Sequence, residues 1–229
     1  MRLFLFDIDG TLVWAHGVGR IALTKAMLAV YGIPPVYEDY DTRGKTDPQI
    51  VYDVMHSAGV PDDVIYARLP SCFEAYVRHL ESLIADGHPV QTMPGIPDLV
   101  RALSHREDSL VGLLTGNIES GARAKLRPTG LLPHFRLGAY GSDDADRRHL
   151  PCIARQRAQT LLGHEIPYEQ IVVIGDTPLD VDCARACGAR AVAVATGQHT
   201  YDELAACSPD LLFADFADIE SALRTLTSG

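Results

Sequence analysis

Residues 3–11 read LFLFDIDGT, in which four consecutive apolar residues run directly into two aspartates, a glycine and a threonine. The apolar residues do not alternate with polar ones, which is the pattern of a strand that is covered on both faces. Strands of this kind belong to parallel sheets that carry helices on both sides. The stretch therefore predicts a buried parallel strand whose carboxyl end presents Asp7 and Asp9.

Three further apolar runs have the same continuous character, at residues 110–114, 171–174 and 191–195. Helical stretches lie between and after them, at residues 97–103, 178–187 and 217–226, and Gly188 follows the second as a helix-stopping residue. Strands that alternate with helices indicate an α/β fold with a doubly wound, Rossmann-like parallel sheet as its core.

The region after the first strand interrupts this alternation, because it shows only helical periodicity. Leu23, Met27 and Val30 recur at helical spacing, and Asp47 is expected to cap a second helix that has Pro48 in its first turn. A third helix is expected over residues 61–85. We expect residues 15–85 to form an all-helical insert, with residues 1–14 and 86–229 as the α/β core.

The totals exclude several classes of protein. The 229 residues suffice for one large domain or for one domain with a smaller insert, and the net charge of −10 gives no sign of a nucleic acid polymer as partner. The five cysteines form no C-x-x-C pair, which argues against disulfides and a cysteine zinc site and favours a reducing cytoplasm. No apolar stretch approaches the roughly 18 residues of a membrane span, so no membrane partner is expected.

Polar clusters follow three of the predicted strands. Asp7 and Asp9 follow the first, Thr115-Gly116-Asn117 follows the second, and residues 175–180, GDTPLD, follow the third. In an open parallel sheet, ligands bind beyond the carboxyl ends of the strands. Any one of these aspartates alone is as readily explained as a helix cap or turn residue. The three clusters in this order are much harder to explain in that way.

Several aspartates that converge on one site repel each other and need protons or a cation. Magnesium suits such a site, because it binds one or two carboxylates together with waters and a substrate phosphate. The expected metal ligands are Asp7, Asp9, Asp176 and Asp180.

With these motifs, FDIDGTL at residues 6–12 and GDTPLD at residues 175–180, the chain resembles the haloacid dehalogenase superfamily. It is most similar to the phosphoglycolate-phosphatase and β-phosphoglucomutase type, which carries a helical cap inserted after the first strand. The resemblance covers essentially the whole chain. The motifs around Asp7 and Asp176 are specific, whereas Thr115 alone is a weak signal.

The resemblance implies a role for each motif residue. Asp7 would attack phosphorus and become an aspartyl phosphate, and Asp9 would serve as general acid and then as base, with its backbone carbonyl on magnesium. Asp176 would be a metal ligand, and Asp180 would complete the metal site directly or through water. Thr115 would hydrogen-bond the phosphoryl oxygens, with Gly116 and Asn117 as neighbouring substrate-binding residues.

One motif departs from the family pattern. The family normally has a lysine upstream of the second aspartate motif, where it balances charge and holds the transferring phosphate, but no lysine follows Lys125 in this chain. The best positional match is Arg147, with Arg148 and Lys125 as alternatives. Arginine can grip a carboxylate or a phosphate in a fork. The alternative reading is that the two arginines only lie at the start of a helix and have no role in the site.

Caps in this family close over the site and select the leaving group. Residues 42–47, TRGKTD, place two cations beside a glycine just before an expected helix N-terminus, where anions are favoured. Arg43 or Lys45 is therefore expected to meet an anionic group of the substrate. A solvated polar loop is the alternative reading.

The sequence thus predicts a magnesium-dependent phosphatase that hydrolyses a small-molecule phosphate monoester. Phosphoglycolate, sugar phosphates and nucleoside monophosphates are candidate substrates, and the chain is expected to be a monomer or homodimer. Asp9 argues against the dehalogenase reaction, because a true dehalogenase of this family lacks an acid–base aspartate at that position. A phosphomutase of the β-phosphoglucomutase type shares every core motif, and a non-catalytic binding module on the same fold is the third reading.

Overall fold

A computed structural model describes residues 1–38 and 40–228, and Asp39 and Gly229 lie outside it. Its main sheet has six strands in the order β5-β4-β1-β6-β7-β8, and every neighbouring pair is parallel. The strands are β1 (Arg2–Phe6), β4 (Ser109–Thr115), β5 (Leu137–Tyr140), β6 (Ile171–Gly175), β7 (Arg190–Val194) and β8 (Leu211–Phe213). The strand order reverses beside the central β1, so the first strand of the chain lies at the topological switch point.

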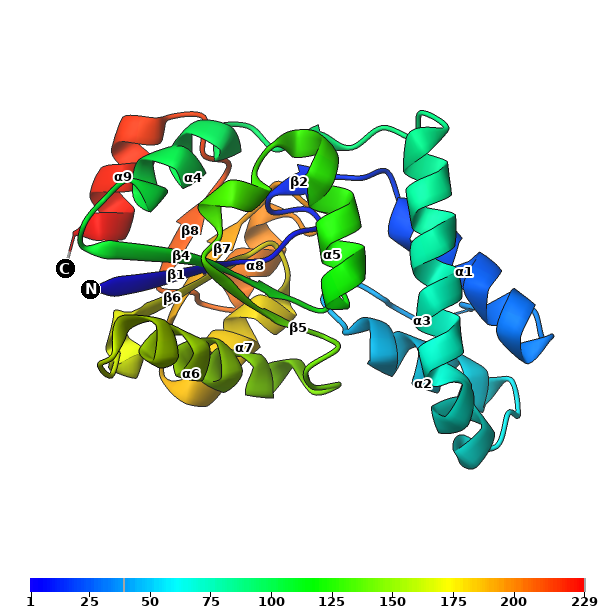
Figure 1. The fold of residues 1–229 in the computed structure, drawn as a ribbon. Helices are drawn as coiled ribbons and strands as arrows, with labels where there is room; N and C mark the ends of the chain where they lie inside the picture. Colours follow the sequence, from blue (N-terminus) through cyan, green and yellow to red (C-terminus); the bar gives the residue numbers. More distant parts are fainter. Residues whose placement is uncertain (39, 229) are drawn as a thin grey trace.

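The side chains of β1 alternate between two apolar layers. Phe4 and Phe6 pack in the layer of helices α4 (Ile96–Ser104), α5 (Glu119–Leu126) and α9 (Ile219–Thr227). Leu3 and Leu5 pack in the layer of α6 (Leu150–Leu162), α7 (Pro178–Cys187) and α8 (Tyr201–Ala206). Figure 1 shows helices on both faces of the sheet. Burial on both faces is the reason why this strand is a continuous apolar run.

The insert is built from three helices: α1 (Val18–Tyr31), α2 (Asp47–Ser57) and α3 (Asp62–Ala85). They share an apolar core of their own, in which Met27, Met55 and Tyr76 are fully buried. The chain leaves and re-enters the core through a two-stranded antiparallel ribbon, β2 (Val13–Trp14) with β3 (Gln91–Thr92). In Figure 1 the insert lies beyond the carboxyl ends of the parallel strands.

The predicted α/β class with an inserted helical cap is therefore confirmed. The division into residues 1–14 with 86–229 and residues 15–85 remains our proposal.

The short 3₁₀ helices are Arg127–Thr129, Leu132–His134, Arg147–His149 and Tyr168–Gln170. Within the described ranges, none of the helices combines the length and the apolar character that a membrane span requires.

The predicted cap of α2 was wrong by one residue. Thr46 is the N-cap, with extended backbone and a hydroxyl that accepts a hydrogen bond from the Gln49 amide at 3.3 Å. Asp47 is instead the first residue of the helix, and its carboxylate accepts a hydrogen bond from the Ile118 amide of the core at 2.8 Å. Threonine and aspartate are both good N-cap residues, so capping preference alone does not decide between them. The hydrogen bond from the core to Asp47 does, because it uses the carboxylate that would otherwise cap the helix.

Candidate active site

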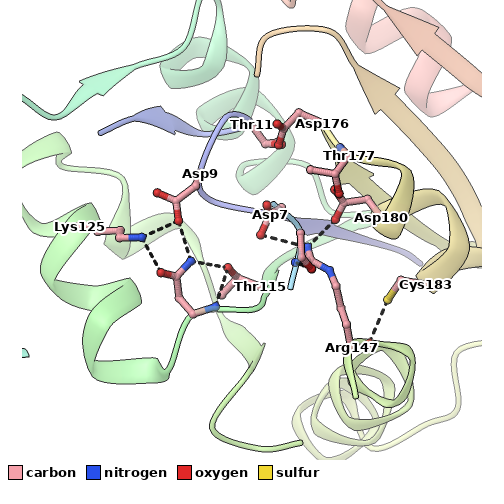
Figure 2. Close-up of polar contacts among 12 residues, drawn as sticks. Asp7, Asp9, Thr11, Thr115, Lys125, Arg147, Asp176, Thr177, Asp180 and Cys183 are labelled. Atoms are coloured by element: carbon pink, nitrogen blue, oxygen red, sulfur yellow. Dashed lines mark hydrogen bonds and ion pairs between the residues drawn. The ribbon is translucent and has the colours of Figure 1, made fainter. Parts of the chain in front are cut away.

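Three buried carboxylates meet where β1 and β6 end. Asp7 follows β1, Asp176 follows β6, and Asp180 lies in the first turn of α7. Each offers an oxygen within 4.8 Å of the others, and all three residues are almost fully buried. Figure 2 shows them facing a common centre. We refer to these three residues as the carboxylate cluster.

Glycines hold Asp176 in this position. A Cβ at Gly10, whose φ is +84°, would lie 2.3 Å from Asp176 Oδ2, and a Cβ at Gly197 would lie 1.8 Å from the same atom. The Thr11 hydroxyl donates to Asp176 Oδ1 at 2.9 Å, and the Thr196 hydroxyl donates to the Gly10 carbonyl at 2.7 Å. Only glycine permits such a close approach of backbone to carboxylate, so the side chain of Asp176 has little freedom.

Arg147 supplies a buried cation to the cluster. Its Nη2 lies 3.1 Å from Asp7 Oδ1 and also donates to Asp180 Oδ1, while its Nη1 donates to the Gly44 carbonyl of the cap at 2.9 Å. The Cys183 thiol of α7 donates to the Arg147 backbone carbonyl at 3.1 Å, and this hydrogen bond holds the Arg147 backbone against α7 (Figure 2). The alternative Arg148 is exposed and pairs with Asp146 at 2.6 Å.

One arginine does not neutralise three buried carboxylates. Burial, with a contribution from the nearby Asp180 and Asp9, raises the pKa of Asp7 to about 6 against the opposing effect of Arg147. Burial, with Asp180 and Asp7, raises the pKa of Asp176 well above its ordinary value. Burial alone would lower the pKa of Arg147, but the charges of Asp180 and Asp7 raise this pKa above its ordinary value. The cluster therefore has the excess negative charge and the hard oxygen donors that fit a divalent cation such as magnesium.

Asp180 has both carboxylate oxygens engaged. Its Oδ2 accepts hydrogen bonds from the Thr177 amide at 3.0 Å and from the Thr177 hydroxyl at 2.7 Å, and its Oδ1 accepts from Arg147. Thr177 is the N-cap of α7, so this pair both starts the helix and orients the carboxylate.

Asp9 lies on the other side of Asp7, in a separate polar group. Its Oδ2 accepts hydrogen bonds from Lys125 Nζ at 2.6 Å and from Asn117 Nδ2 at 2.9 Å. Lys125 is buried and also donates to Asn117 Oδ1 at 2.6 Å. Figure 2 shows the Asp9 side chain turned toward Lys125 and away from the carboxylate cluster. The side chain of Asp9 is thus held by Lys125 and Asn117, apart from the carboxylate cluster.

The loop after β4 joins this polar group to the cap. The Thr115 hydroxyl accepts hydrogen bonds from the Asn117 amide at 3.3 Å and from Asn117 Nδ2 at 2.9 Å. The Gly116 carbonyl accepts from the Asp47 amide at 2.7 Å, and a Cβ at Gly116 would lie 2.2 Å from the Lys45 carbonyl. The cap is therefore closed onto the loop that carries Thr115.

The two predicted cap cations are held within the cap. Arg43 pairs with Asp41 at 2.7 Å and is partly exposed. Lys45 Nζ lies 3.8 Å from the centre of the Tyr40 ring and 3.7 Å from Asp53. Both residues line the same cavity as Asp7 and Asp9, so they are within the site, although each already has an acidic partner.

Core and cap together enclose a cavity of about 430 Å³. All the predicted site residues line it except Asp180, which lies directly behind Asp7 and Arg147. Two contributors had no predicted role in the site: Thr11, which fixes Asp176, and Tyr76, which lines the cap side of the cavity. Thr11 belongs to a quoted motif, but nothing in the chain order signals that Tyr76 from the third cap helix enters the site.

Comparison with known proteins agrees with this geometry. Residues 4–185 match the family model described as haloacid dehalogenase-like hydrolase, and the chain belongs to that family. It is 28% identical over 230 residues to a phosphoglycolate phosphatase from Synechococcus elongatus, with 99% of each chain covered. The prediction of a hydrolase of the family's phosphatase kind is thereby confirmed.

Solved structures share the whole fold. A hydrolase from Pseudomonas syringae has a TM-score of 0.73 with 21% identity, and the match covers 100% of both chains. A putative β-phosphoglucomutase from Thermotoga maritima has a TM-score of 0.61 with 17% identity, and the match covers 98% of this chain and 99% of that chain. These likenesses establish the fold of core and cap.

Proposed function

We propose that the protein is a magnesium-dependent phosphatase that hydrolyses a small-molecule phosphate monoester by way of a phosphorylated Asp7. The observation that carries the proposal is the position of Asp7. On one side of its carboxylate lie the buried Asp176 and Asp180 together with Arg147. On the other side lies Asp9, which Lys125 holds separately. The name of the Synechococcus relative supports the reaction class.

Asp7, Asp176 and the backbone carbonyl of Asp9 would hold the magnesium ion. Asp180 would complete the site, and its engaged oxygens favour contact through a water. The ion, when bound, would neutralise the carboxylates and the phosphoryl oxygens, which otherwise repel each other.

In the first step, an Asp7 oxygen forms a bond to phosphorus while the bond from phosphorus to the ester oxygen breaks. Asp9 gives its proton to that departing oxygen, and Lys125 stabilises the carboxylate that remains. In the second step Asp9 takes a proton from water, whose oxygen attacks phosphorus. The bond to Asp7 then breaks, and phosphate leaves.

The chain's own residues hold the transferring group. Thr115 and the Gly116 amide would bind phosphoryl oxygens from the β4 side, with Asn117 fixing Thr115 and Asp9 relative to one another. Arg147 would take the place of the usual lysine, since it contacts Asp7 directly whereas Arg148 lies at the surface. Arg43 and Lys45 would contact the leaving group from the cap.

The five cysteines are all free thiols, which supports a reducing cytoplasm as the location. We further propose that the protein works as a monomer or a homodimer on a soluble phosphate ester.

The proposal is tested by phosphate release from a panel of monoesters, with magnesium or with a chelator, for the natural protein and for Asp7→Asn. We expect release only with magnesium and only with Asp7. Equal release by both proteins would remove Asp7 from the mechanism. Isomerised substrate with no free phosphate would favour the phosphomutase, and the absence of any reaction would favour a binding module.

A further inference from the structure

The cavity extends from Asp9 into a space between helices α1, α2, α3 and α5. We call this space the cap recess and define it by Gly19, Asp47, Tyr76 and Lys125, all of which line the cavity. It adjoins the proposed acid through Lys125, which donates to Asp9 at 2.6 Å. A leaving group released beside Asp9 would therefore lie against these residues.

Tyr76 brings an unsatisfied hydroxyl to the recess. The residue is fully buried, and its Oη has no hydrogen-bond partner among residues 1–38 and 40–228. A buried hydroxyl without a partner destabilises a fold. Burial raises the pKa of Tyr76 well above its ordinary value, with Asp47 and Asp9 adding to the effect, so the hydroxyl keeps its proton and can donate.

Lys125 faces the same small space. A Cβ at Gly19 would lie 2.8 Å from Lys125 Nζ and 3.5 Å from Tyr76 Oη, so both polar atoms lie close to the α1 backbone at Gly19. An ammonium group has three N–H donors. Two of them serve Asp9 and Asn117, and no described residue accepts the third.

Asp47 adds an acceptor to these two donors. One of its carboxylate oxygens accepts the Ile118 amide, and the other accepts no hydrogen bond from the described part of the chain. The recess thus offers a ligand two donors, from Tyr76 and Lys125, and one acceptor, from Asp47. Lys125 lies near both Asp47 and Asp9, so its positive charge is already shared between two acidic side chains.

We propose that the cap recess is the leaving-group subsite and that it binds a hydroxyl group, which makes the preferred substrate a phosphate ester of a sugar or polyol. A hydroxyl can accept from Tyr76 and Lys125 while it donates to Asp47. A carboxylate can only accept, so it would offer no donor to the free Asp47 oxygen and would be repelled by that carboxylate. The inference rests on the proposed phosphatase function and selects among its candidate substrates.

The test compares two substrates that share a three-carbon skeleton, glycerol 3-phosphate with a terminal hydroxymethyl group and 3-phosphoglycerate with a carboxylate. We expect kcat/KM to favour glycerol 3-phosphate by about tenfold or more, as for a site that hydrogen-bonds a hydroxyl. Tyr76→Phe should raise KM for glycerol 3-phosphate by about tenfold, because it removes one donor to the ligand. Its melting temperature should not fall, since the lost hydroxyl has no partner in the protein.

Tyr31→Phe is the matched control, because the Tyr31 hydroxyl donates to the Ile65 carbonyl inside the cap at 3.0 Å. This variant should melt at a lower temperature and keep the KM of the natural protein. Equal or better turnover of 3-phosphoglycerate, or an unchanged KM in Tyr76→Phe, would overturn the proposal.

Turnover of p-nitrophenyl phosphate separates this inference from the function on which it rests. Magnesium-dependent hydrolysis of that ester by the natural protein but not by Asp7→Asn, together with no preference for hydroxylated esters, would overturn the subsite alone. No hydrolysis of any ester would overturn both proposals.

Discussion

Arg147 connects Asp7, Asp180 and the cap. Its guanidinium contacts Asp7 and Asp180 with one nitrogen and the Gly44 carbonyl with another. A lysine ammonium is a single point of charge on a flexible stem, whereas a guanidinium presents several donors in a fixed plane. An arginine at this position can therefore hold Asp7 and the closed cap together, which a lysine could not do.

This use predicts that Arg147→Lys lowers kcat about tenfold or more, because lysine keeps the charge but cannot reach Asp7, Asp180 and the cap at once. Arg147→Ala should also lower the free energy of unfolding, by about 3 kcal/mol, because it leaves buried carboxylates without their cation. Steady-state kinetics and urea unfolding measure the two effects. Arg148→Lys, at an exposed pair with Asp146, is the control and should change neither. An Arg147→Lys enzyme with natural kcat would contradict the assignment.

Lys125 contacts Asp9 at 2.6 Å, and in the proposed mechanism it acts through this contact. Lys125→Met keeps much of the length of the side chain but removes the charge that stabilises the Asp9 carboxylate after proton transfer. We expect kcat to fall about tenfold to a hundredfold for alkyl phosphates, whose leaving group needs a proton, in keeping with the size of general acid catalysis. The loss should be much smaller for p-nitrophenyl phosphate. Equal losses for both kinds of ester would mean that Lys125 does not serve the acid.

Single residues were predictable from the sequence where chemistry and chain order coincide. Asp7, Asp9 and Asp176 were named because each follows an apolar strand, and the carboxyl ends of neighbouring parallel strands lie at one edge of the sheet. The contact of Lys125 with Asp9 was not predictable, since it depends on the packing of α5 against the loop after β1. The position of Tyr76 beside Lys125 depends in the same way on the packing of the cap.

At the scale of elements, the cap segment before α2 packs tightly on the core. A Cβ at Gly44 would lie 2.6 Å from the Thr177 hydroxyl, and the Thr46 hydroxyl donates to the Ala145 carbonyl at 2.7 Å. The closed cap therefore depends on small residues and on short polar contacts along one segment.

Gly44→Ala is expected to hold the cap away from the core, and so to raise KM and lower kcat by about tenfold together, as hinge and lid mutations do. Gly32→Ala is the matched control: Gly44 has a φ of +72° and Gly32 a φ of +73°, but a Cβ at Gly32 meets nothing within 4 Å. Both variants should lose about 1 kcal/mol of stability from the positive φ. Urea unfolding of the two variants measures the backbone strain that they share, and steady-state kinetics measures the effect of the steric clash that only Gly44→Ala introduces. Equal kinetics in both variants would show that this contact does not matter.

Elements were predictable where the pattern was long. The four apolar runs correspond to β1, β4, β6 and β7, and the three cap helices were expected near their observed positions. The strands β5, with the sequence LGAY, and β8, with the sequence LLF, were missed. Each has four residues or fewer, so neither provides a periodicity that can be told from a turn or a helix end. They are strands because a paired neighbour, β4 or β7, fixes them.

At the scale of the whole molecule, the protein has three apolar cores. Two of them cover the faces of the sheet and the third lies in the cap. The cavity of the candidate active site lies between the sheet domain and the cap. The sequence predicted the insert and the edge of the sheet that it covers. It did not predict that the cap is closed, because closure rests on the backbone contacts of Gly44, Gly116 and Asp47. The partners in these contacts are far apart in the chain, so no local sequence pattern marks them.

Excess negative charge at the carboxylate cluster predicts a stabilising effect of metal on the whole fold. Magnesium should raise the melting temperature by several degrees, since a ligand at a hundred times its Kd contributes about 2.7 kcal/mol. A chelator should reverse the shift. Asp176→Asn removes one carboxylate from the cluster and should melt at the same temperature with and without magnesium. Differential scanning calorimetry measures both proteins, and an equal magnesium shift in the variant would place the ion elsewhere.

If the phosphoryl group passes through Asp7, acid quenching of a reaction in its first turnovers should trap the phosphorylated residue. The quenched protein is digested at low pH, and the peptides are weighed by mass spectrometry. The account predicts one added phosphoryl group on the peptide that contains Asp7, present with magnesium and absent from Asp7→Asn. Phosphate release with no modified peptide at any quench time, or a phosphoryl group on another residue, would contradict it.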